Sequence, residues 1–351
     1  MLKRLFTIYL LPGIVFQSII VAGGYATGQE LVQYFLKLGP LDGLLAMGVT
    51  LTVWSLLSAA TFLLAYRIKA YDYKNLLKHL LGRGWILYEG CYIYVIVLVL
   101  SIISITVAHL LHDTLNMPLT VGILLCLAAI FVISLKSSAL IEKAFTFWTL
   151  LLYLVFFVIL VLSIMKSNTN VISLLKIKQP NWSWIKNGII YACYNAAALP
   201  AVVFAMRHVQ SGKQATIAGL LAGPIAMVPG IIFYFALLTD HQAVLSVMIP
   251  SKHLLDNLGY VSLTILFTIM LGGTLIQTGV GLLHAFYKRL HVEHKKSYGA
   301  IALVFVAALM TQLGLIELIA KGYTVLSWIT IGVFVIPLII HSLRPRLSQY
   351  F

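Results

Sequence analysis

Residues 23–30, Gly23-Gly24-Tyr25-Ala26-Thr27-Gly28-Gln29-Glu30, decide the fold class, because they place glycines and a carboxylic acid inside a long apolar segment. Apolar residues 6–22 precede this stretch, and residues 31–36 continue the segment after it. Glycines lower helix propensity, and a helix that spans a bilayer would carry Glu30 near mid-membrane depth. The stretch therefore predicts a membrane helix that is interrupted near its middle.

The composition of the whole chain is that of a polytopic membrane protein. Its 351 residues are 61% hydrophobic and 10% charged, whereas soluble chains are about 45–50% apolar and about 25% charged. These values exclude an ordinary cytosolic enzyme, a secreted disulfide scaffold and a disordered protein. The net charge of +14 comes from Lys and Arg in short gaps between apolar runs. This placement predicts anchoring of loops at the membrane and no nucleic-acid partner.

The predicted fold class is an all-α polytopic membrane protein with about ten transmembrane helices, each needing about 20 residues to cross the bilayer. The predicted spans are residues 6–37, 41–66, 84–110, 118–135, 139–165, 184–207, 213–238, 259–287, 298–316 and 322–342. If the N-terminus is cytoplasmic, 17 of the 24 Lys and Arg residues fall in segments on the cytoplasmic side of the predicted spans. The other 7 fall in segments on the outer side. The positive-inside rule requires this direction, so both termini are predicted to be cytoplasmic.

The spacing of the spans predicts an internal repeat. Adding 171 to the second span gives 212–237, which almost coincides with the seventh span at 213–238. Five spans per repeat is an odd number, so the two halves would have opposite orientations in the membrane, an architecture built for alternating access. We divide the chain into a first repeat (1–165), an extracellular connecting loop (166–183), a second repeat (184–342) and a cytoplasmic tail (343–351). Accidental matching of span lengths is the alternative.

A second interruption lies at the matching place in the sixth span. The stretch 194–200 reads YNAAALP, and its Pro200 removes a backbone donor and clashes with the preceding turn. Two interrupted segments at matching positions indicate a transporter binding site, because backbone groups freed from a helix cannot face lipid. The alternative is that the glycines serve helix packing and Pro200 is a structural kink. The predicted substrate-binding residues are Gly23, Gly24, Tyr25, Ala26, Thr27, Gly28, Tyr194, Asn195, Ala196 and Ala197.

The stretch GGYATGQELVQYF, which carries Gly24, Ala26, Thr27, Gly28 and Glu30, resembles the glycine-rich first helix of the YkvI-type bacterial membrane proteins. The YkvI-type proteins in turn resemble divergent members of the amino acid–polyamine–cation superfamily. The resemblance implies a LeuT-like fold with a 5+5 inverted repeat, helices 1 and 6 broken, and a transport role in the bacterial cytoplasmic (inner) membrane. It covers the whole chain in length and span pattern, but the specific motif is this one segment, and it implies no particular cargo.

Glu30 is the first candidate for coupling transport to an ion gradient, because an ionisable residue inside a span is costly and by default functional. It could carry a proton, form a gate ion pair with Lys321 or Lys37, or act as a structural cap, since a carboxylate is stabilised at a helix N-terminus. The predicted coupling or gate residues are Glu30, Gln29, Glu89 and Lys143. Glu89 could reach an inner route or pair with Arg207.

The resemblance also implies a candidate cation site between the first break and the eighth span. Its ligands here would be backbone carbonyls of the first break together with side chains that share one helix face at i, i+3, i+4. The residues are Ile20, Gly23, Thr274, Gln277 and Thr278. Gln277 stands where a second hydroxyl residue is expected, and Thr hydroxyls inside a span commonly bond within their own helix.

Some members of the superfamily use a lysine of the fifth helix in place of the sodium ion. Lys143 is the nearest candidate here, with an interfacial, snorkelling role as the alternative.

Other polar and aromatic residues give weaker signals. Tyr25, Tyr92 and Tyr194 could form an aromatic wall of a substrate site, although helical aromatic residues also serve plain packing. The three cysteines lie inside apolar stretches and are expected to be buried thiols. No spacing of the ten histidines predicts a metal site, and we expect no catalytic residues and no cofactor.

The sequence as a whole predicts a secondary active transporter that moves a small amino-acid-like or other nitrogen-bearing solute by alternating access. Its coupling ion would be H⁺ or Na⁺, and its partners would be the small-molecule substrate and the lipid bilayer. The sequence contains no nucleotide-binding loop, which excludes ATP-driven pumping by this chain alone. A ligand-binding receptor on a transporter scaffold and an ion channel are the alternatives, and an intramembrane enzyme is not expected.

Overall fold

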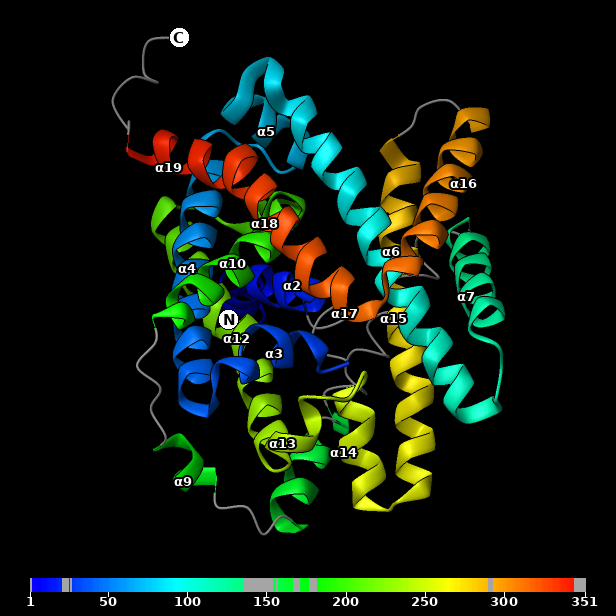
Figure 1. Ribbon diagram of the computed structural model, residues 1–351. Helices are drawn as coiled ribbons and strands as arrows, with labels where there is room; N and C mark the ends of the chain where they lie inside the picture. Colours follow the sequence, from blue (N-terminus) through cyan, green and yellow to red (C-terminus); the bar gives the residue numbers. More distant parts are fainter. Residues whose placement is uncertain are drawn as a thin grey trace.

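The computed structural model describes residues 2–20, 25, 27–135, 154–155, 157–166, 171–176, 182–289 and 293–343, and its regular elements in these ranges are all helical (Figure 1). Five of the described helices are long and apolar enough to cross a membrane, and a bent pair can supply a sixth span. Four shorter apolar helices, Phe6–Ile20, Leu119–Ser134, Phe157–Lys166 and Tyr298–Leu313, lie within or close to four further predicted spans.

The elements of the first half are α1 (Leu2–Leu5), η1 (Phe6–Leu10), α2 (Leu11–Ile20), α3 (Gln29–Tyr34), η3 (Leu36–Leu38), α4 (Pro40–Arg67), α5 (Tyr73–Leu81), η4 (Gly82–Gly84), α6 (Trp85–Leu115), α7 (Leu119–Ser134) and α9 (Val171–Leu175). The elements of the second half are α10 (Ser183–Ala196), α11 (Leu199–Val202), η5 (Val203–His208), α12 (Gly212–Leu238), α13 (His241–Val244), α14 (Pro250–Leu258), α15 (Val261–Arg289), α16 (Glu293–Met310), η6 (Thr311–Leu313), α17 (Leu315–Glu317), η7 (Leu318–Gly322), α18 (Tyr323–Thr330), η8 (Ile331–Val335) and α19 (Ile336–Leu343).

Local sequence signals explain several of these boundaries. Pro40 occupies the first turn of α4, where the missing N–H costs nothing. Asp72 caps α5 by accepting a hydrogen bond from the Asn75 N–H at 2.8 Å, and Ser211 caps α12 in the same way. Such caps satisfy N–H groups that have no partner inside the helix. The first residues of α4, α5 and α12 are therefore set by capping and proline residues at those positions in the sequence.

The second and seventh predicted spans, α4 and α12, pack against each other along their lengths. Their backbones approach so closely that a Cβ added at Gly219 would lie 2.3 Å from Ala59 Cα. One added at Gly223 would lie 2.2 Å from the Ser55 hydroxyl oxygen, and this hydroxyl donates to the Leu220 carbonyl at 3.0 Å. Small residues permit such contact between membrane helices, where van der Waals packing and hydrogen bonds supply the attraction.

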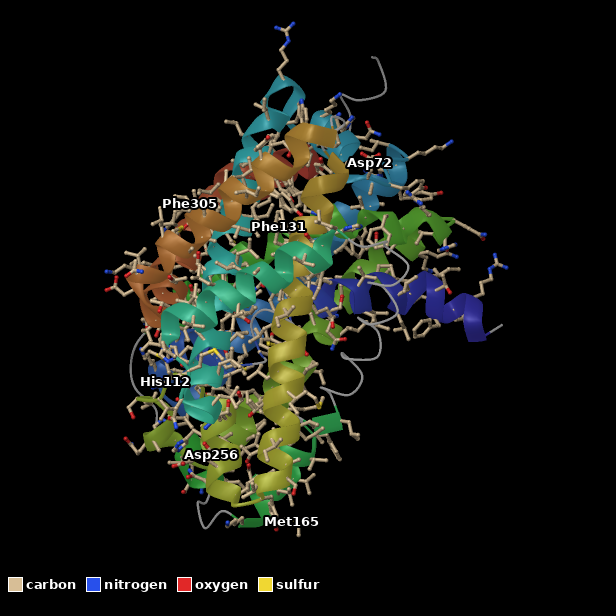
Figure 2. The ribbon with its side chains drawn as sticks, turned by 90° about the vertical axis from the view of Figure 1, so that its right-hand side faces the viewer. Asp72, His112, Phe131, Met165, Asp256 and Phe305 are labelled. Atoms are coloured by element: carbon tan, nitrogen blue, oxygen red, sulfur yellow. The ribbon has the colours of Figure 1, made fainter. Side chains whose placement is uncertain are left out.

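The connecting segments gather at two opposite ends of the helical bundle. Helices α5 and α19 lie at one end, and α13 and α14 lie at the other (Figure 1). In the view turned by 90°, Asp72 lies near the first end, whereas Asp256 and Met165 lie at the opposite end (Figure 2). Asp72 lies in the segment 67–83, which is predicted to be cytoplasmic. Asp256 lies in the segment 239–258, which is predicted to be extracellular, and Met165 is the last residue of the span 139–165.

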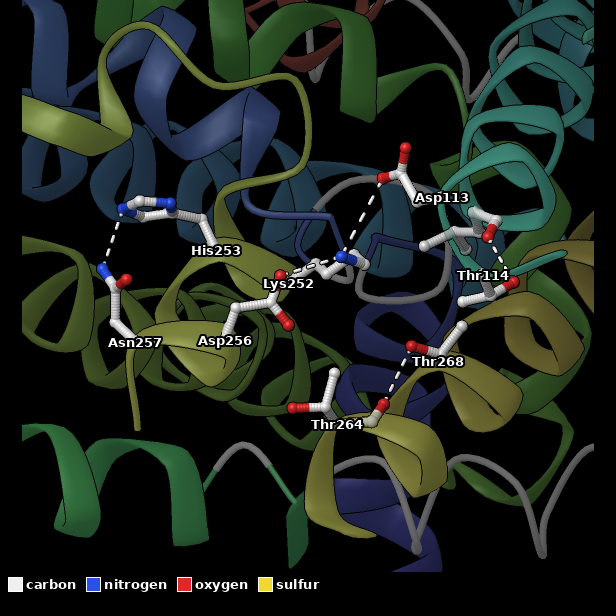
Figure 3. Close-up of polar contacts among 9 residues, drawn as sticks. Asp113, Thr114, Lys252, His253, Asp256, Asn257, Thr264 and Thr268 are labelled. Carbon is white, nitrogen blue, oxygen red and sulfur yellow. Dashed lines mark hydrogen bonds and ion pairs between the residues drawn. The ribbon is translucent and has the colours of Figure 1, made fainter. Parts of the chain in front are cut away.

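The α14 end carries a network of polar contacts. Lys252 forms ion pairs with Asp256 at 2.8 Å and with Asp113, near the end of α6, at 3.9 Å (Figure 3). Asp240 accepts hydrogen bonds from Asn257 at 2.7 Å and approaches His253 at 2.9 Å. These contacts connect α14 to its preceding loop and to the end of α6.

Candidate binding site at two interrupted helices

A new helix begins directly after the described part of the first predicted break. Helix α2 is described as far as Ile20, and α3 begins at Gln29 after a turn in which the Gly28 N–H donates to the Tyr25 carbonyl at 3.0 Å. Gly28 has φ +79°, and a Cβ there would lie 3.0 Å from the Phe233 ring and 3.1 Å from Pro250. Only glycine fits this conformation without strain. Gly23, Gly24 and Ala26 lie outside the described residues.

The second predicted break also coincides with an interruption. The helix Ser183–Ala196 and the segment Leu199–His208 meet at a bend of 44°. Pro200 lies in the first turn of the new helix, as expected for a residue that cannot continue the old one. The Ala197 carbonyl accepts a hydrogen bond from the Tyr88 hydroxyl at 2.5 Å. Ala196 is buried, and the Asn195 side chain donates to the Tyr191 carbonyl of its own helix at 3.2 Å.

Glu30 connects the two interrupted segments. It lies in the first turn of α3, only 2% exposed, and its carboxyl group accepts a hydrogen bond from the Tyr194 hydroxyl of α10. The Tyr191 hydroxyl approaches the same oxygen at 3.4 Å, and the Tyr323 ring of α18 stacks on the Tyr194 ring. The carboxyl group therefore lies where α3, α10 and α18 meet.

Aromatic rings surround this carboxyl group. The rings of Tyr194 and Tyr323 stack with centroids 4.3 Å apart, and Tyr191 packs edge-on against Tyr194 at 5.2 Å. Tyr34, four residues after Glu30 on α3, lies 5.3 Å from Tyr191 and 5.9 Å from Tyr194. We call Tyr34, Tyr191, Tyr194 and Tyr323 the tyrosine cluster. Buried aromatic pairs at these distances are attractive beyond the area they bury.

The lysines proposed as gate partners of Glu30 contact other groups. Lys37 donates to the Gln33 carboxamide at 2.6 Å, and Lys321 pairs with Glu317 at 3.0 Å. Among the described residues, Glu30 has no ion pair with a cationic side chain. Its hydrogen-bond partners are tyrosine hydroxyls, so this conformation shows no Glu30 gate pair within the described part of the chain.

The candidate cation ligands of the eighth span hydrogen-bond within their own helix. The Thr274 hydroxyl donates to the Met270 carbonyl at 2.8 Å, and the Thr278 hydroxyl donates to the Thr274 carbonyl at 3.0 Å. The Gln277 carboxamide oxygen is buried and has no hydrogen-bond partner among the described residues. Ile20 is buried at the end of α2, and Gly23 lies outside the described residues.

The remaining predicted residues occupy different surroundings. Gln29 is buried, its N–H donates to the Thr27 hydroxyl at 3.2 Å, and its carboxamide oxygen has no partner in the described residues. Glu89 is half-buried in α6, next to Tyr88. Lys143 lies outside the described residues.

Of the three tyrosines proposed as a substrate wall, Tyr194 contacts Glu30. The Tyr25 ring instead packs on Gly230 of α12, and its hydroxyl lies 3.7 Å from Met227 Sδ. The Tyr92 hydroxyl contacts the Leu282 carbonyl at 3.3 Å on the packed face between α6 and α15.

Helix α14 covers the described end of the first break. The Ser251 N–H, in the first turn of α14, donates to the Thr27 carbonyl at 3.1 Å. Pro250, at the start of the same helix, packs beside Gly28. The carbonyl group released by the break is therefore satisfied by protein, as backbone at membrane depth requires.

Three members of the tyrosine cluster did not emerge from the sequence. Tyr191 lies three residues before Tyr194, and Tyr34 lies four residues after Glu30, so helical spacing could have placed each on the face of its neighbour. No local signal connects Tyr323 to Glu30, because their approach depends on how α18 packs against α3 and α10.

We expect Tyr194→Phe to lower the thermal stability of the protein in detergent. The substitution removes the hydroxyl that donates to Glu30 and leaves a buried carboxyl oxygen with one fewer partner. Loss of a hydrogen bond to a charged group costs about 1.5–3 kcal/mol. Differential scanning fluorimetry is the measurement, and Tyr298→Phe, at an exposed tyrosine, is the control that should leave stability unchanged. Equal unfolding temperatures for wild type and Tyr194→Phe would show that the hydrogen bond adds nothing.

The chain is distantly homologous to a known membrane protein over most of its length. It is 22% identical over 323 residues to the uncharacterized membrane protein YkvI of Bacillus subtilis, covering 91% of this chain and 92% of that protein. No protein-family model matches the chain.

Solved structures show the same fold. A variant of the Eremococcus coleocola manganese transporter matches with a TM-score of 0.62 and 14% identity, over 95% of this chain and 79% of that one. The inward-facing conformation of Mhp1 matches with a TM-score of 0.57 and 15% identity, over 93% of this chain and 76% of that one. The protein is therefore structurally similar to LeuT-fold transporters.

Proposed function

We propose that this protein is a secondary active transporter that moves a small amino-acid-like or other nitrogen-bearing solute by alternating access. In this proposal about ten spans form two inverted five-helix repeats, residues 1–165 and 184–342, with the first and sixth spans broken. The likeness to LeuT-fold transporters and the positions of α4 and α12 at matching places of the two halves support it. Both termini would lie in the bacterial cytoplasm.

The observation that carries the proposal is the buried carboxyl group of Glu30 between the two interrupted segments. An ionised carboxylate inside a membrane protein is costly unless positive charge or hydrogen bonds compensate it. Tyrosine hydroxyls supply hydrogen bonds here but no charge, and the described residues provide no cationic partner. A proton, a metal cation or an ammonium group of a solute would neutralise the charge.

This arrangement suits coupling because neutralisation of Glu30 would change the contacts that join α3, α10 and α18. A protonated carboxyl group accepts fewer hydrogen bonds from tyrosine hydroxyls than a carboxylate does. A cation near the ring faces of the tyrosine cluster would also be attracted by their π-systems. Binding at this point would therefore favour one arrangement of the three helices over another, which is the requirement for a population shift.

Sodium is the alternative coupling ion. The buried carboxamide oxygens of Gln29 and Gln277 have no hydrogen-bond partner among the described residues, and oxygen atoms are the ligands that hard cations prefer. Gln277 lies beside Thr274 and Thr278 on the eighth predicted span, as the candidate cation site requires.

The test is a thermal-shift screen of the purified protein against the standard amino acids and small aliphatic amines. Each compound is measured with and without Na⁺, at pH 5.5 and pH 7.5, for wild type and Glu30→Gln. Stabilisation that is indifferent to Na⁺ and depends on pH in wild type, but no longer depends on pH in Glu30→Gln, would support proton coupling. Stabilisation that requires Na⁺ would support sodium coupling through the candidate cation site at Thr274, Gln277 and Thr278. If no compound shifts the unfolding temperature under any condition, the proposed substrate class is wrong.

Compounds that bind are then tested for counterflow in proteoliposomes. Exchange of labelled compound across the membrane distinguishes a transporter from a receptor, which binds without exchange. Binding without counterflow would overturn the transport proposal and favour a ligand-binding receptor on the same fold.

A further inference from the structure

An apolar groove lies between α10 and the segment formed by α18 and η8. Its volume is about 490 Å³, within the range of about 300–1,000 Å³ that is typical of small-molecule sites. Its walls are the side chains of Trp182, Ile185, Ile189, Trp328 and Ile331, together with Lys186. The two tryptophans are 78% and 60% exposed, so the groove opens to the outside of the bundle.

The groove backs onto the candidate binding site. The same helix α10 carries Tyr191 and Tyr194, whose hydroxyl groups contact Glu30. The two walls are joined by the Ser327 hydroxyl of α18, which donates to the Ile190 carbonyl of α10 at 2.7 Å. Whatever fills the groove therefore contacts two of the three helices that meet at Glu30.

The surroundings of the groove determine the chemistry of its occupant. In a membrane-spanning bundle, an outward-facing apolar groove is exposed to lipid acyl chains. Trp182 lies just before α10, and tryptophans are enriched at the headgroup level of the bilayer. From Trp182 to Ile190 the groove follows about 12 Å of helix, at about 1.5 Å per residue. It can therefore take part of an acyl chain that runs inward from the headgroup region.

Lys186 adds a charge to this groove, halfway along α10 between Trp182 and Ile190. It is exposed, and among the described residues it has no acidic or hydrogen-bonding side-chain partner. A long Lys side chain near a membrane interface reaches toward the headgroups, and a phosphate is a strong acceptor for its ammonium group. A positive charge next to an apolar groove complements a molecule with an anionic head and an apolar tail.

We propose that this groove binds an anionic phospholipid, with one acyl chain between α10 and α18 and the phosphate at the Lys186 ammonium group. The bound chain would pack against both helices and stabilise their contact on the side opposite the tyrosine cluster. This proposal does not depend on transport, because it concerns the outer surface of the bundle.

Binding is measured by native mass spectrometry and thermal shift on delipidated protein in detergent. The probes are phosphatidylglycerol and phosphatidylcholine with identical acyl chains, each added at several concentrations. We expect phosphatidylglycerol to bind about five- to tenfold more tightly, the ratio that one charge-assisted contact of about 1–1.4 kcal/mol gives. Glycerol phosphate, which has the headgroup chemistry without acyl chains, should not stabilise the protein.

Two variants test the two parts of the proposal separately. Lys186→Gln should remove the preference for phosphatidylglycerol, whereas Lys176→Gln, an exposed lysine away from the groove, should keep it. Ile189→Trp, at a 39% exposed position, should fill the groove and weaken binding of both lipids. Equal affinity for the two lipids in wild type, or an unchanged preference in Lys186→Gln, would refute the phosphate contact. Undiminished binding in Ile189→Trp, or equal stabilisation by glycerol phosphate, would refute the acyl-chain site.

Discussion

Glu30→Gln is expected to lower solute uptake driven by an inward proton gradient many-fold while leaving the protein folded. Glutamine keeps the size of the side chain and an oxygen that can accept the Tyr194 hydroxyl, so the contact between α3 and α10 is retained. It cannot bind or release a proton at neutral pH. Driven uptake should therefore fall by about five- to 150-fold, the range that a coupling free energy of about 1–3 kcal/mol supports.

The measurement uses proteoliposomes with a pH-sensitive dye inside and a mixture of labelled amino acids and aliphatic amines outside. Counterflow without a pH gradient should persist in Glu30→Gln, because exchange does not require net proton movement. Glu317→Gln is the matched control, since Glu317 is an exposed glutamate that pairs with Lys321. If pH-driven uptake in Glu30→Gln equals that of wild type, Glu30 is not the proton carrier.

Gly219→Leu should prevent the chain from reaching its folded state. A Cβ at this position would lie 2.3 Å from Ala59 Cα and 2.4 Å from its backbone nitrogen. The contacting atoms belong to the backbone of α4, so no side-chain rotation can relieve the overlap. Because α4 and α12 pack along their lengths, separating them would disrupt this whole interface. We expect a cost of more than about 4 kcal/mol, which exceeds the usual effect of a point substitution.

Fluorescence-detected size-exclusion chromatography of a green fluorescent protein fusion measures this effect directly. Gly219→Leu should give aggregate and little monodisperse protein. Gly48→Leu is the matched control, because Gly48 lies inside α4, the partner helix of α12, and has open space where a Cβ would be placed. A monodisperse peak of wild-type height for Gly219→Leu would show that the two helices do not approach as closely as described.

Much of the helical framework was predictable because its signals are local. The predicted second and seventh spans, 41–66 and 213–238, agree within one or two residues with α4 and α12. A described helix begins at each predicted break, at Gln29 after Gly28 and at Leu199 next to Pro200. Glycine and proline act on the backbone of their own turn, so their effect does not depend on the rest of the fold.

The partners of individual polar side chains were not predictable from the sequence. Lys37 and Lys321, proposed as gate partners of Glu30, instead contact residues four positions away on their own helical segments. Thr274 and Thr278 also hydrogen-bond within their own helix. A charge or hydroxyl group in the sequence indicates a need for a partner but does not identify it.

The sequence by itself determined the membrane environment, the positions of the long helices and the location of Glu30 at an interruption. These properties follow from hydrophobicity and backbone propensity, which act over a few helical turns. Only the tertiary structure decided that Tyr191, Tyr194 and Tyr323 surround Glu30, and that α10 and α18 leave a groove on their outer side. These features arise where α3, α10 and α18 meet, and packing between segments far apart in the chain sets that meeting point.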